Sequence, residues 1–328
     1  MAQKTILITG GAGYIGSHVL LQLQSRGECV VALDNLHTGF RQAVPSAPLI
    51  VGDAGDRDLV AGVIREHQID TVMHFAANTI VPESVREPLR YYGNNTCATR
   101  NLLDTCMAQG VRQLVFSSTA AVYGEPEHTP IAETDPTRPT SPYGASKLAV
   151  DTTLTEFCRL HGFGAVSLRY FNVAGAQRSA DGTWLGERHH PETHLIPNVL
   201  AAATNGRPVQ VFGEDYPTPD GTCVRDYIHV ADLADAHLRA LAACRAGQHS
   251  IYNLGNGAGF SVREVIEVCR EVTGADIGTD VAGRRAGDPA VLVASAAKIQ
   301  TELGWRATRD LRAMAGDAWQ FTQARSHR

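Results

Sequence analysis

A tyrosine and a lysine stand four residues apart in the segment SPYGASK at residues 141–147. In a helix, positions i and i+4 lie on the same face, so the side chains of Tyr143 and Lys147 would be neighbours. A nearby ammonium group favours the phenolate, and a phenol with a pKa near ~10 becomes a useful base once that pKa falls. The pair therefore predicts a general base, with Lys147 lowering the pKa of Tyr143. An ordinary amphipathic helix can carry the same pair, so the neighbouring motifs must decide.

Hydroxyl groups precede this pair in the segment FSSTAAVYG at residues 116–124. The segment reads as the end of a buried strand, and the carboxyl ends of parallel strands face the crevice in which ligands bind. Ser118 or Thr119 could there bond a substrate oxygen and relay its proton to Tyr143.

Three glycines, Gly10, Gly13 and Gly16, form a GxxGxxG pattern between an expected strand and an expected helix. Glycine lets the backbone turn tightly and approach a pyrophosphate at a helix N-terminus. Asp34 ends the next expected strand, where a carboxylate can bind a ribose 2′-hydroxyl and would repel a 2′-phosphate. These residues predict NAD as the cofactor in preference to NADP.

Two further segments that end strands are expected to flank this cofactor. The residues GD at 52–53 and HFAAN at 74–78 would line its adenine and nicotinamide-ribose sides.

The elements that must position these residues alternate between short apolar runs and helical patterns. Expected strands are KTILITG, ECVVALD, LIVGD, DTVMHFAA, QLVFSS and GAVSLRYFN. Helices are expected after the glycines, at roughly 56–67 and 86–109, and from Pro142 to about His161, where Ser141 would be the N-cap. This alternation predicts an α/β fold: a doubly wound parallel sheet of the Rossmann type.

After Asn172 the pattern changes, beginning with a polar, turn-rich stretch at 175–194. We expect a Rossmann-type domain at 1–175, rejoined by about 228–258, and a smaller α/β substrate lobe at 176–328. Further helices are expected near 261–273, 295–303 and 309–322.

Composition excludes several classes of protein. The chain has 328 residues, 44% apolar and 19% charged, with a net charge of −5. It shows no basic block, so nucleic acid and anionic membrane are poor partners. No apolar run approaches the ~18 residues of a membrane span, and the start of the chain does not resemble a signal peptide. Seven scattered cysteines without a CxxC motif fit buried thiols in a reducing cytoplasm.

Two histidine-rich groups could suggest metal ligands. In GERHHPETH, the histidines 189, 190 and 194 stand beside Glu187 and Glu192, but their spacing matches no standard zinc pattern, so we expect a substrate loop without metal. The group His229, Asp232, Asp235 and His237 opens an expected helix and fits capping and packing.

Together the glycine motif, the hydroxyl-bearing strand end and Tyr-x-x-x-Lys resemble the extended short-chain dehydrogenase/reductase superfamily. Over nearly its whole length the chain resembles the UDP-glucose 4-epimerase family in particular. The motifs in the family's order are ITGGAGYIGSH, FSSTAAVYG, SPYGASK, LRYFNVAGA, VFGEDYPTPDGTCVRDYIHVADLADAH, YNLGNG and RRAGDP. The block at 211–237 is the most specific, because generic dinucleotide folds do not share it.

The resemblance implies roles for individual residues. Tyr143 would be the base, Lys147 its electrostatic partner and a cofactor ligand, and Thr119 the donor to the substrate oxygen. The implied cofactor residues are Gly10, Gly13, Tyr14, Ile15, Gly16, Asp34, Asn35, Asp53, Ala54, Phe75, Ala76, Asn94, Tyr143, Lys147 and Tyr170. The implied substrate residues are Thr119, Tyr143, Asn172, His194, Leu195, Phe212, Arg225, Arg285 and Asp288. Guanidinium groups also suit a diphosphate on chemical grounds.

Three positions depart from the family pattern. Many members carry a lysine where this chain has Thr79, and some carry an asparagine at the position of His194. The residue that gates the family's sugar pocket falls on Leu292, whose intermediate bulk leaves the acceptance of N-acetylated sugars open.

The resemblance implies reversible 4-epimerisation of UDP-galactose and UDP-glucose through a transient 4-keto sugar and bound NADH, in a cytoplasmic homodimer. Related 4-epimerases act on UDP-pentoses, UDP-uronates or UDP-N-acetylhexosamines. A nucleotide-sugar dehydratase is a weaker alternative, because relatives with that chemistry carry Asp-Glu where this chain has Ala120 and Ala121. A non-catalytic NAD-sensing protein is weaker still, because such proteins typically lose the Tyr/Lys pair. The dimer would use apolar faces of the helices near 86–109 and 142–161.

Overall fold

The computed structural model describes residues 5–285 and 287–326. Residues 1–4, 286 and 327–328, which belong to the expected domains 1–175 and 176–328, lie outside the described residues. The chain forms two compact units that interleave along the sequence. The first unit is Met1–Gly124, Thr137–Arg169 and Ala234–Tyr252, and the second is Glu125–Pro136, Tyr170–Leu233 and Asn253–Arg328.

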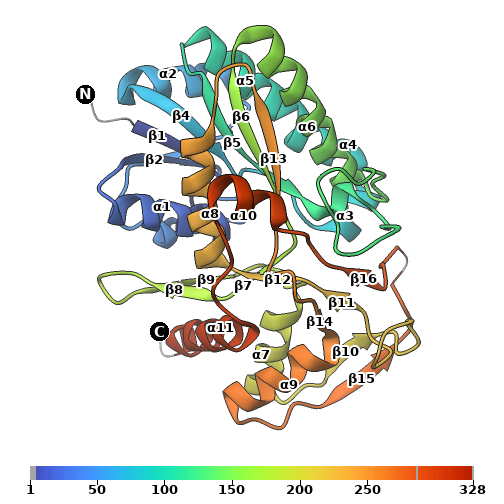
Figure 1. The fold of residues 1–328 in the computed structure, drawn as a ribbon. Helices are drawn as coiled ribbons and strands as arrows, with labels where there is room; N and C mark the ends of the chain where they lie inside the picture. The colour runs from blue at the N-terminus through green and yellow to red at the C-terminus, as the bar shows by residue number, and fades with distance from the viewer. Residues whose placement is uncertain (1–4, 286, 327–328) are drawn as a thin grey trace. The chain divides into compact units, whose positions relative to one another are not determined.

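A seven-stranded sheet is the centre of the first unit (Figure 1). Its strands, in order across the sheet, are β13 (His249–Leu254), β6 (Gly164–Tyr170), β5 (Gln113–Thr119), β4 (Ile69–His74), β1 (Thr5–Thr9), β2 (Cys29–Asp34) and β3 (Leu49–Val51). From β5 to β3, neighbouring strands pair in parallel. The strand order reverses between β1 and β4, and ligands of doubly wound sheets bind at the carboxyl ends beside such a point. The predicted fold class is confirmed.

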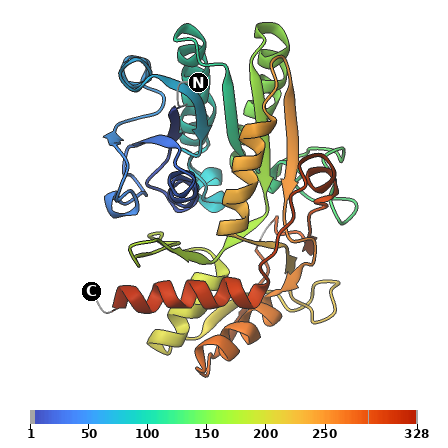
Figure 2. The same cartoon turned by 60° about the vertical axis from the view of Figure 1, so that its left-hand side comes forward.

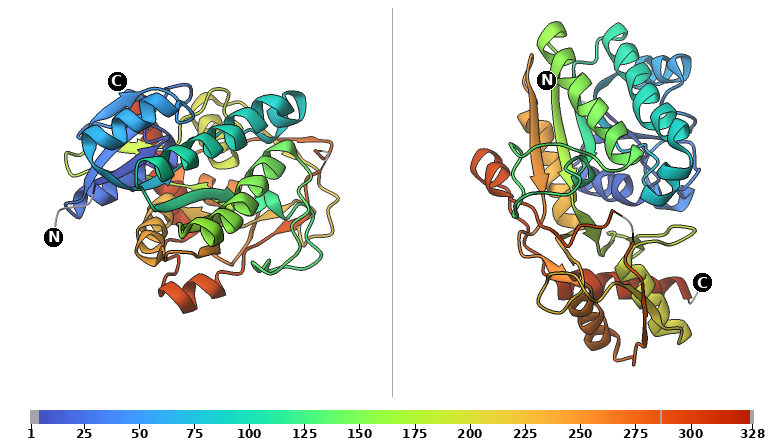
Figure 3. Two further views of the ribbon diagram at one scale, coloured as in Figure 1. Left: turned by 90° about the horizontal axis from the view of Figure 1, so that it is seen from above. Right: turned by 90° about the vertical axis from the view of Figure 1, so that its right-hand side faces the viewer.

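Helices cover both faces of this sheet (Figure 3). The helices are α1 (Tyr14–Ser25), α2 (Arg57–His67), α5 (Ala98–Ala108), α6 (Pro142–His161) and α8 (Val230–Ala243). Helices α2, α5 and α6 share one apolar core with the strands, to which Val60, Leu102 and Leu154 contribute. Helices α1 and α8 lie against the opposite face.

The helix that carries the Tyr/Lys pair has the bounds that the sequence predicts. The Ser141 side chain accepts a hydrogen bond from the Gly144 N–H, and Pro142 occupies the first turn. Gly162 ends the helix with a φ of 64°, a left-handed conformation that glycine adopts without strain. Strong signals at both ends therefore fix where Tyr143 stands.

The helix expected at roughly 86–109 is confirmed from Pro88 to Ala108, but it is not α-helical throughout. The structure has α3 (Val81–Arg86), α4 (Pro88–Tyr91) and a π-helical turn at Tyr92–Cys97 before α5. Pro88 disfavours helical geometry in the preceding residue, and Glu87 indeed has φ −126° and ψ 56°. The π turn contains Asn94 and Asn95, so their side chains point in directions that a regular α-helix would not give them.

The second unit packs short strands against helices. Its strands are β7 (Asn172–Ala174), β8 (Ala176–Arg178), β9 (Trp184–Gly186), β10 (Val209–Phe212), β11 (Val224–Arg225), β12 (Tyr227–His229), β14 (Phe260–Ser261), β15 (Thr279–Ala282) and β16 (Val291–Leu292). Its helices are α7 (Leu195–Asn205), α9 (Val262–Thr273), α10 (Ala297–Leu303) and α11 (Leu311–Ser326). Helices α7, α9 and α11 lie side by side around one apolar core (Figure 2).

The group at the start of α8 serves structure, as predicted. His229 Nδ1 accepts from the Ala231 N–H at 3.0 Å, and Asp232 accepts from the backbone N–H of Thr308 at 2.9 Å. Asp235 pairs with Arg239, and the His237 ring packs on Phe75 with 4.9 Å between ring centroids.

The cysteines are all free thiols, but they are not all buried. Cys29 and Cys97 are exposed, so the expectation of buried thiols is wrong for these two. Cys29 is the first residue of β2, the neighbour of the edge strand β3, and Cys97 is the last residue of the π turn. The sequence pattern does not show that these two positions are exposed. Among the described helices, none is long and apolar enough to cross a lipid bilayer.

Candidate functional site

Tyr143 and Thr119 meet at the carboxyl end of β5. The Thr119 oxygen accepts the Ala121 N–H at 3.1 Å, which leaves its own proton free to donate to the Tyr143 oxygen. Burial raises the pKa of Tyr143, and the hydrogen bond with Thr119 opposes that rise. The sequence prediction of a lowered pKa is therefore wrong for this structure, because burial outweighs the effect of the hydroxyl.

Lys147 lies one turn further along α6 and is only 2% exposed. Its Nζ donates a 2.7 Å hydrogen bond to the Ser117 carbonyl and stands 4.7 Å from the centre of the Phe116 ring. Burial lowers the pKa of Lys147 to about 7, although the charge of Asp151 raises it. The ammonium is thus fixed beside β5 but is easily deprotonated, which limits its effect on Tyr143.

The neighbouring hydroxyl, Ser118, has a different partner. Its oxygen donates to Asp151 Oδ2 at 3.0 Å, and Arg169 Nε donates to the same oxygen at 3.1 Å. Arg169 also bonds the Tyr123 hydroxyl at 2.8 Å. Of the two hydroxyls that the sequence left open for the proton relay, the structure brings only Thr119 to Tyr143.

A cavity of about 280 Å³ lies in the first unit where β1, β2 and β4 end. It is lined by nine of the residues expected to hold the cofactor: Gly10, Gly13, Asp34, Asn35, Asp53, Ala54, Phe75, Ala76 and Asn94. The lining also contains Gly52, His74, Ala77 and Asn78, from the two flanking segments. Tyr14, Ile15 and Gly16 are at the start of α1 behind it, and Tyr170 ends β6 with 7% exposure.

The glycines of this cavity suit the close approach of a pyrophosphate. A Cβ on Gly10 would lie 2.6 Å from the Ala76 nitrogen, and one on Gly16 would lie 2.2 Å from the Gly10 oxygen. No side chain caps α1, and no acidic residue stands in its first turn, so neither competes with an anion at this helix N-terminus. The backbone at this turn therefore fits a dinucleotide.

Asp34, which the sequence predicts to select NAD, lines the cavity and is held by the backbone. It is 7% exposed, and its two oxygens accept the N–H groups of Ala12 at 2.9 Å and Leu36 at 2.8 Å. A carboxylate has about four lone-pair positions, so this pinned group can still accept ribose hydroxyls. Its negative charge disfavours a phosphate at the same place.

His74 ties three elements together at the cavity wall. Its Nδ1 is 2.6 Å from the Thr9 hydroxyl of β1, and its Nε2 is 2.8 Å from the Thr99 hydroxyl of α5. Because Thr99 donates its proton to the Asn95 carbonyl, it accepts from Nε2–H, and Thr9 donates to Nδ1. Burial lowers the pKa of His74 to about 3, so the ring is neutral.

The π turn contributes a buried amide that sequence reasoning missed. Asn95 is 1% exposed; it accepts from the Asn78 N–H at 2.9 Å and donates to Ser146 Oγ at 3.1 Å. The turn therefore links the cofactor cavity to α6, close to Tyr143. π turns in helices often occur at functional sites, but the sequence carries no strong signal for one.

Other missed lining residues are Leu33, His37, Thr38, Arg90 and Ala98. Arg90 bonds His37 Nε2 at 2.9 Å and pairs with Glu83 at 3.0 Å, so it holds two segments at the cavity rim. Nothing in its sequence context distinguishes it from an ordinary surface arginine. Thr79, in doubt from the sequence, is exposed and does not line the cavity.

In the second unit, four of the expected substrate residues form one cluster. Arg225 bonds Asp288 Oδ1 at 2.9 Å, and Arg285 Nε is 3.9 Å from the other oxygen of Asp288. The Arg285 guanidinium lies 4.1 Å from the centre of the Phe212 ring. Asn172 is tied to this region because its N–H donates to the carbonyl of Asp226, the neighbour of Arg225.

Leu292 belongs to the same region, since it pairs with Arg225 between β16 and β11 and is half-buried. His194 and Leu195 lie instead at the start of α7. Burial alone would lower the pKa of His194, but the charges of Glu187 and Glu192 outweigh burial and raise this pKa to about 10. Burial alone would raise the pKa of Glu187, but the imidazoles of His194 and His189 outweigh burial and lower this pKa to about 2.

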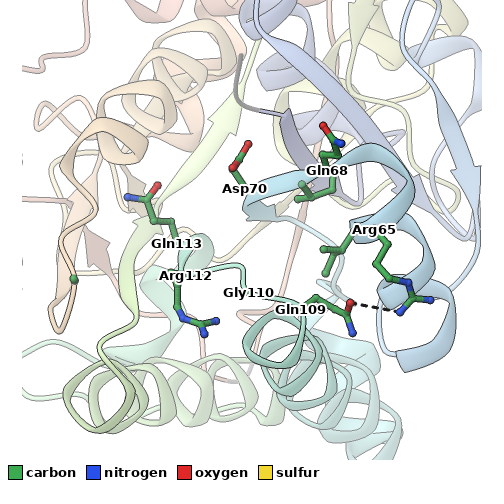
Figure 4. A pocket seen from close by; sticks show the side chains of 10 residues that line it. Arg65, Gln68, Asp70, Gln109, Gly110, Arg112 and Gln113 are labelled. Carbon is green, nitrogen blue, oxygen red and sulfur yellow. Dashed lines mark hydrogen bonds between the residues drawn. The ribbon is translucent and has the colours of Figure 1, made fainter. Parts of the chain in front are cut away.

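A second cavity, of about 530 Å³, lies at the opposite ends of the strands of the seven-stranded sheet (Figure 4). Arg65, Asp70, Gln109, Arg112 and Gln113 are among its lining residues, and Arg65 bonds Gln109 at 3.4 Å. The strands β4 and β5 begin beside this cavity. Because doubly wound sheets bind ligands at the carboxyl ends of their strands, this cavity is separate from the predicted site.

Comparisons with known proteins agree with this geometry. The family model "NAD dependent epimerase/dehydratase family" matches residues 6–255. A UDP-glucose 4-epimerase of Corynebacterium glutamicum is 52% identical over 328 residues, which cover 98% of each chain.

Solved structures are similar over the same length. A UDP-glucose 4-epimerase from Stenotrophomonas maltophila with bound NAD and formylated UDP-arabinopyranose has a TM-score of 0.94 at 40% identity, covering 99% of each chain. One from Bifidobacterium longum in complex with NAD⁺ and UDP has a TM-score of 0.93 at 38% identity, covering 98% of this chain and 99% of that one. The chain therefore belongs to the NAD dependent epimerase/dehydratase family, in which it groups with the UDP-glucose 4-epimerases.

Proposed function

We propose that the protein is an NAD-dependent isomerase that interconverts UDP-galactose and UDP-glucose by inverting carbon 4 of the sugar. The observation that carries the proposal is the hydrogen bond between Tyr143 and Thr119 at the end of β5, with Lys147 bonded to the Ser117 carbonyl of the same strand. The dinucleotide cavity lies at the carboxyl ends of the neighbouring strands of the same sheet. The family and the relatives named above support the same reaction.

Tyr143 is the proposed base. Its phenolate would take the proton of the 4-hydroxyl, directly or through Thr119, and the phenol would return that proton to the 4-oxygen when the keto sugar is reduced. Thr119 stabilises the phenolate by donating to it. Lys147, whose Nζ bonds the Ser117 carbonyl, would add a positive charge beside this pair when protonated, and Asp151 favours its charged form.

The cofactor residues fit NAD, with the glycine turn for the pyrophosphate and Asp34 for the ribose. When bound, NAD supplies a hydride acceptor that takes the hydrogen of carbon 4 and gives it back, so the cofactor ends unchanged. Asn94 and the backbone around Ala76 would orient it.

We further propose that Arg225, Arg285 and Asp288 hold the UDP moiety, with Phe212 beside the uracil and Asn172, His194 and Leu195 as additional contacts. Two guanidinium groups suit a diphosphate. Strong binding of the non-reacting UDP and weak binding of the sugar would allow the keto sugar to rotate in the site before it is reduced.

The two-domain division is proposed on the same basis: NAD in residues 1–175 with the returning stretch 228–258, and UDP-sugar in 176–328. We also propose a homodimer in the cytoplasm. Free cysteines suit a reducing compartment, and the exposed Val85, Leu89 and Tyr92 offer an apolar surface for a second copy.

Other UDP-sugars remain alternatives at the same site. Half-buried Leu292 would set the space around the sugar's 2-substituent, and hence whether UDP-N-acetylhexosamines enter. Pentose and uronate substrates differ by pocket shape in the same way.

The test uses protein purified without added cofactor. We would incubate it with UDP-galactose, separate the products by chromatography, and run Tyr143→Phe and a UDP-N-acetylgalactosamine sample beside it. We expect UDP-glucose to form without external NAD and the variant to be at least about 100-fold slower, as befits loss of a general base.

The variant must keep its bound NAD, measured after denaturation, so that its defect lies in proton transfer. Conversion by Tyr143→Phe at the wild-type rate would refute its role. No conversion of UDP-galactose, with NAD supplied, would refute the galactose assignment and direct the search to pentose or uronate substrates.

A further inference from the structure

Two imidazoles and two carboxylates converge in the segment between β9 and α7. His194 Nδ1 is 2.7 Å from Glu187 Oε1 and 3.1 Å from Glu192 Oε1. His189 Nδ1 is 3.2 Å from the same Glu187 oxygen and 3.8 Å from Glu192 Oε2. One ligand-type atom from each residue lies within 4.8 Å of all the others.

Hydrogen bonds account for only part of this arrangement, since His194 Nδ1 bonds Glu192 Oε1 but His189 is left over. His189 Nδ1 is shielded from solvent, yet it makes no hydrogen bond of good geometry to a described residue, even though a Glu187 oxygen lies 3.2 Å away. The Glu187 side chain is 7% exposed and faces both rings. The His189 nitrogen and the Glu187 oxygen therefore lie close together without a well-formed hydrogen bond. Two ligand atoms of one cation have the same arrangement.

We propose that Glu187, His189, Glu192 and His194 bind one divalent cation of the zinc type. Zn²⁺ takes imidazole nitrogen and carboxylate oxygen at about 2.0–2.2 Å, which separates neighbouring ligand atoms in a tetrahedron by roughly 3.3 Å. The four contacts, from 2.7 to 3.8 Å, bracket that separation. Two carboxylates neutralise a divalent charge, so the cation would replace the imidazole proton as the positive centre.

The backbone around the site supports it. Glu192 Oε1 accepts the N–H groups of Thr193 and His194, both at 2.9 Å, which holds the carboxylate against the rings. Such outer contacts orient metal ligands. The ligands follow the spacing E-x-H-x-x-E-x-H, which differs from the usual cysteine and histidine patterns, and this difference is why the sequence favoured a loop without metal.

Coordination through Nδ1 would leave Nε2 of His194 as a donor on the other side of the ring. The proposal does not depend on the proposed reaction, because metal content and activity are measured separately. Its structural effect would be to tie a polar loop to the start of α7.

The test measures zinc retained by protein whose affinity tag has been removed. After dialysis against a chelator, each protein receives excess Zn²⁺, is desalted and is analysed by plasma mass spectrometry. Four proteins are compared: wild type, Glu187→Gln, His189→Gln and His190→Gln. His190 is the matched control, because it is exposed and lies in the same loop outside the cluster.

We expect wild type and His190→Gln to retain one zinc per chain, and the other two to bind it at least about 10–100-fold more weakly. Zinc should raise the Tm of the first two proteins only, and Co²⁺ should give them the strong visible absorption of a tetrahedral site. Circular dichroism checks folding; should buried Glu187→Gln unfold, His189→Gln decides alone. No retention by wild type, or equal retention by all the folded proteins, overturns the proposal.

Discussion

The adjacent hydroxyls of Ser118 and Thr119 at the end of β5 have different hydrogen-bond partners. Thr119 bonds Tyr143 at the start of α6, whereas Ser118 bonds Asp151, which lies two turns further along the same helix and is paired with Arg169. The sequence can supply both candidates for the proton relay, but only the direction of each side chain separates them.

This difference predicts two distinct mutant phenotypes. Thr119→Val should lower kcat by about 10²-fold, because the phenolate loses its donor, with little change in stability. Ser118→Ala should keep kcat within about twofold but lower the free energy of unfolding by about 1–3 kcal/mol, because Asp151 loses a buried partner. Steady-state kinetics and urea unfolding check both. Equal kinetic losses would contradict the assignment.

Lys147 predicts a pH-dependent conflict between function and stability. Its pKa in the fold is about 7, against an ordinary value of 10.5. Below pH 7 the group is charged in both states, and the cost of burying that charge is fully present. Between pH 7 and 10.5 the folded state releases the proton that the unfolded state keeps, so stability rises with pH.

Replacing Lys147 by methionine should remove this cost. We expect Lys147→Met to be inactive yet about 2–4 kcal/mol more stable at pH 6, after allowing for the lost bond to Ser117. The advantage should shrink toward pH 10. Urea unfolding of both cofactor-free proteins across this range measures it, and a pH-independent difference would show that Lys147 is not strongly perturbed.

At the scale of elements, His74 joins β1, β4 and α5 through Thr9 and Thr99. Its pKa is about 3 in the fold and 6.5 ordinarily. As pH falls from 6.5 to 3, the unfolded state takes up a proton that the folded state excludes, so stability is lost over this interval, by at most about 5 kcal/mol.

His74→Gln should therefore flatten the acid limb of the stability curve while lowering stability at pH 7. Carboxylates titrate in the same interval, so the informative quantity is the difference from wild type in urea unfolding between pH 4 and 7. Exposed His128→Gln is the control. A constant difference between His74→Gln and wild type would contradict a neutral, buried ring.

Elements with strong local signals were predictable, and the rest depended on tertiary contacts. Helix α6 has a cap, an initial proline and a final glycine, and its predicted bounds are confirmed. The glycine turn and Asp34 were found because a cofactor demands those residue types. The break at Pro88 and the π turn were not, since no local pattern shows that Asn95 will bond residues far away in sequence.

At the scale of the molecule, unpaired apolar side chains suggest self-association. Leu89 is 86% exposed and Val85 is 62% exposed. Large apolar groups gathered on one surface often mark an interface between proteins. The surface formed by Val85, Leu89 and Tyr92 is our candidate for the dimer contact.

Leu89→Glu should shift the protein toward a monomer, because the new charge would have to be buried in the contact. Light scattering coupled to size-exclusion chromatography measures the molar mass at several concentrations. Val281→Glu is the matched control, since Val281 is 57% exposed on β15 in the other unit. Unchanged mass for Leu89→Glu would place the contact elsewhere, or show that the protein is a monomer throughout.

The interleaving of the two units also has a consequence for synthesis on the ribosome. The edge strand β13 ends at Leu254, whereas its neighbour β6 ends at Tyr170. At about 5–20 residues per second, translation takes roughly 4–17 s to supply the intervening segment. During that interval β6 is an open edge, a template to which strands of other nascent chains can add. The order in which the chain is made thus leaves the first unit incomplete until half of the second has been translated.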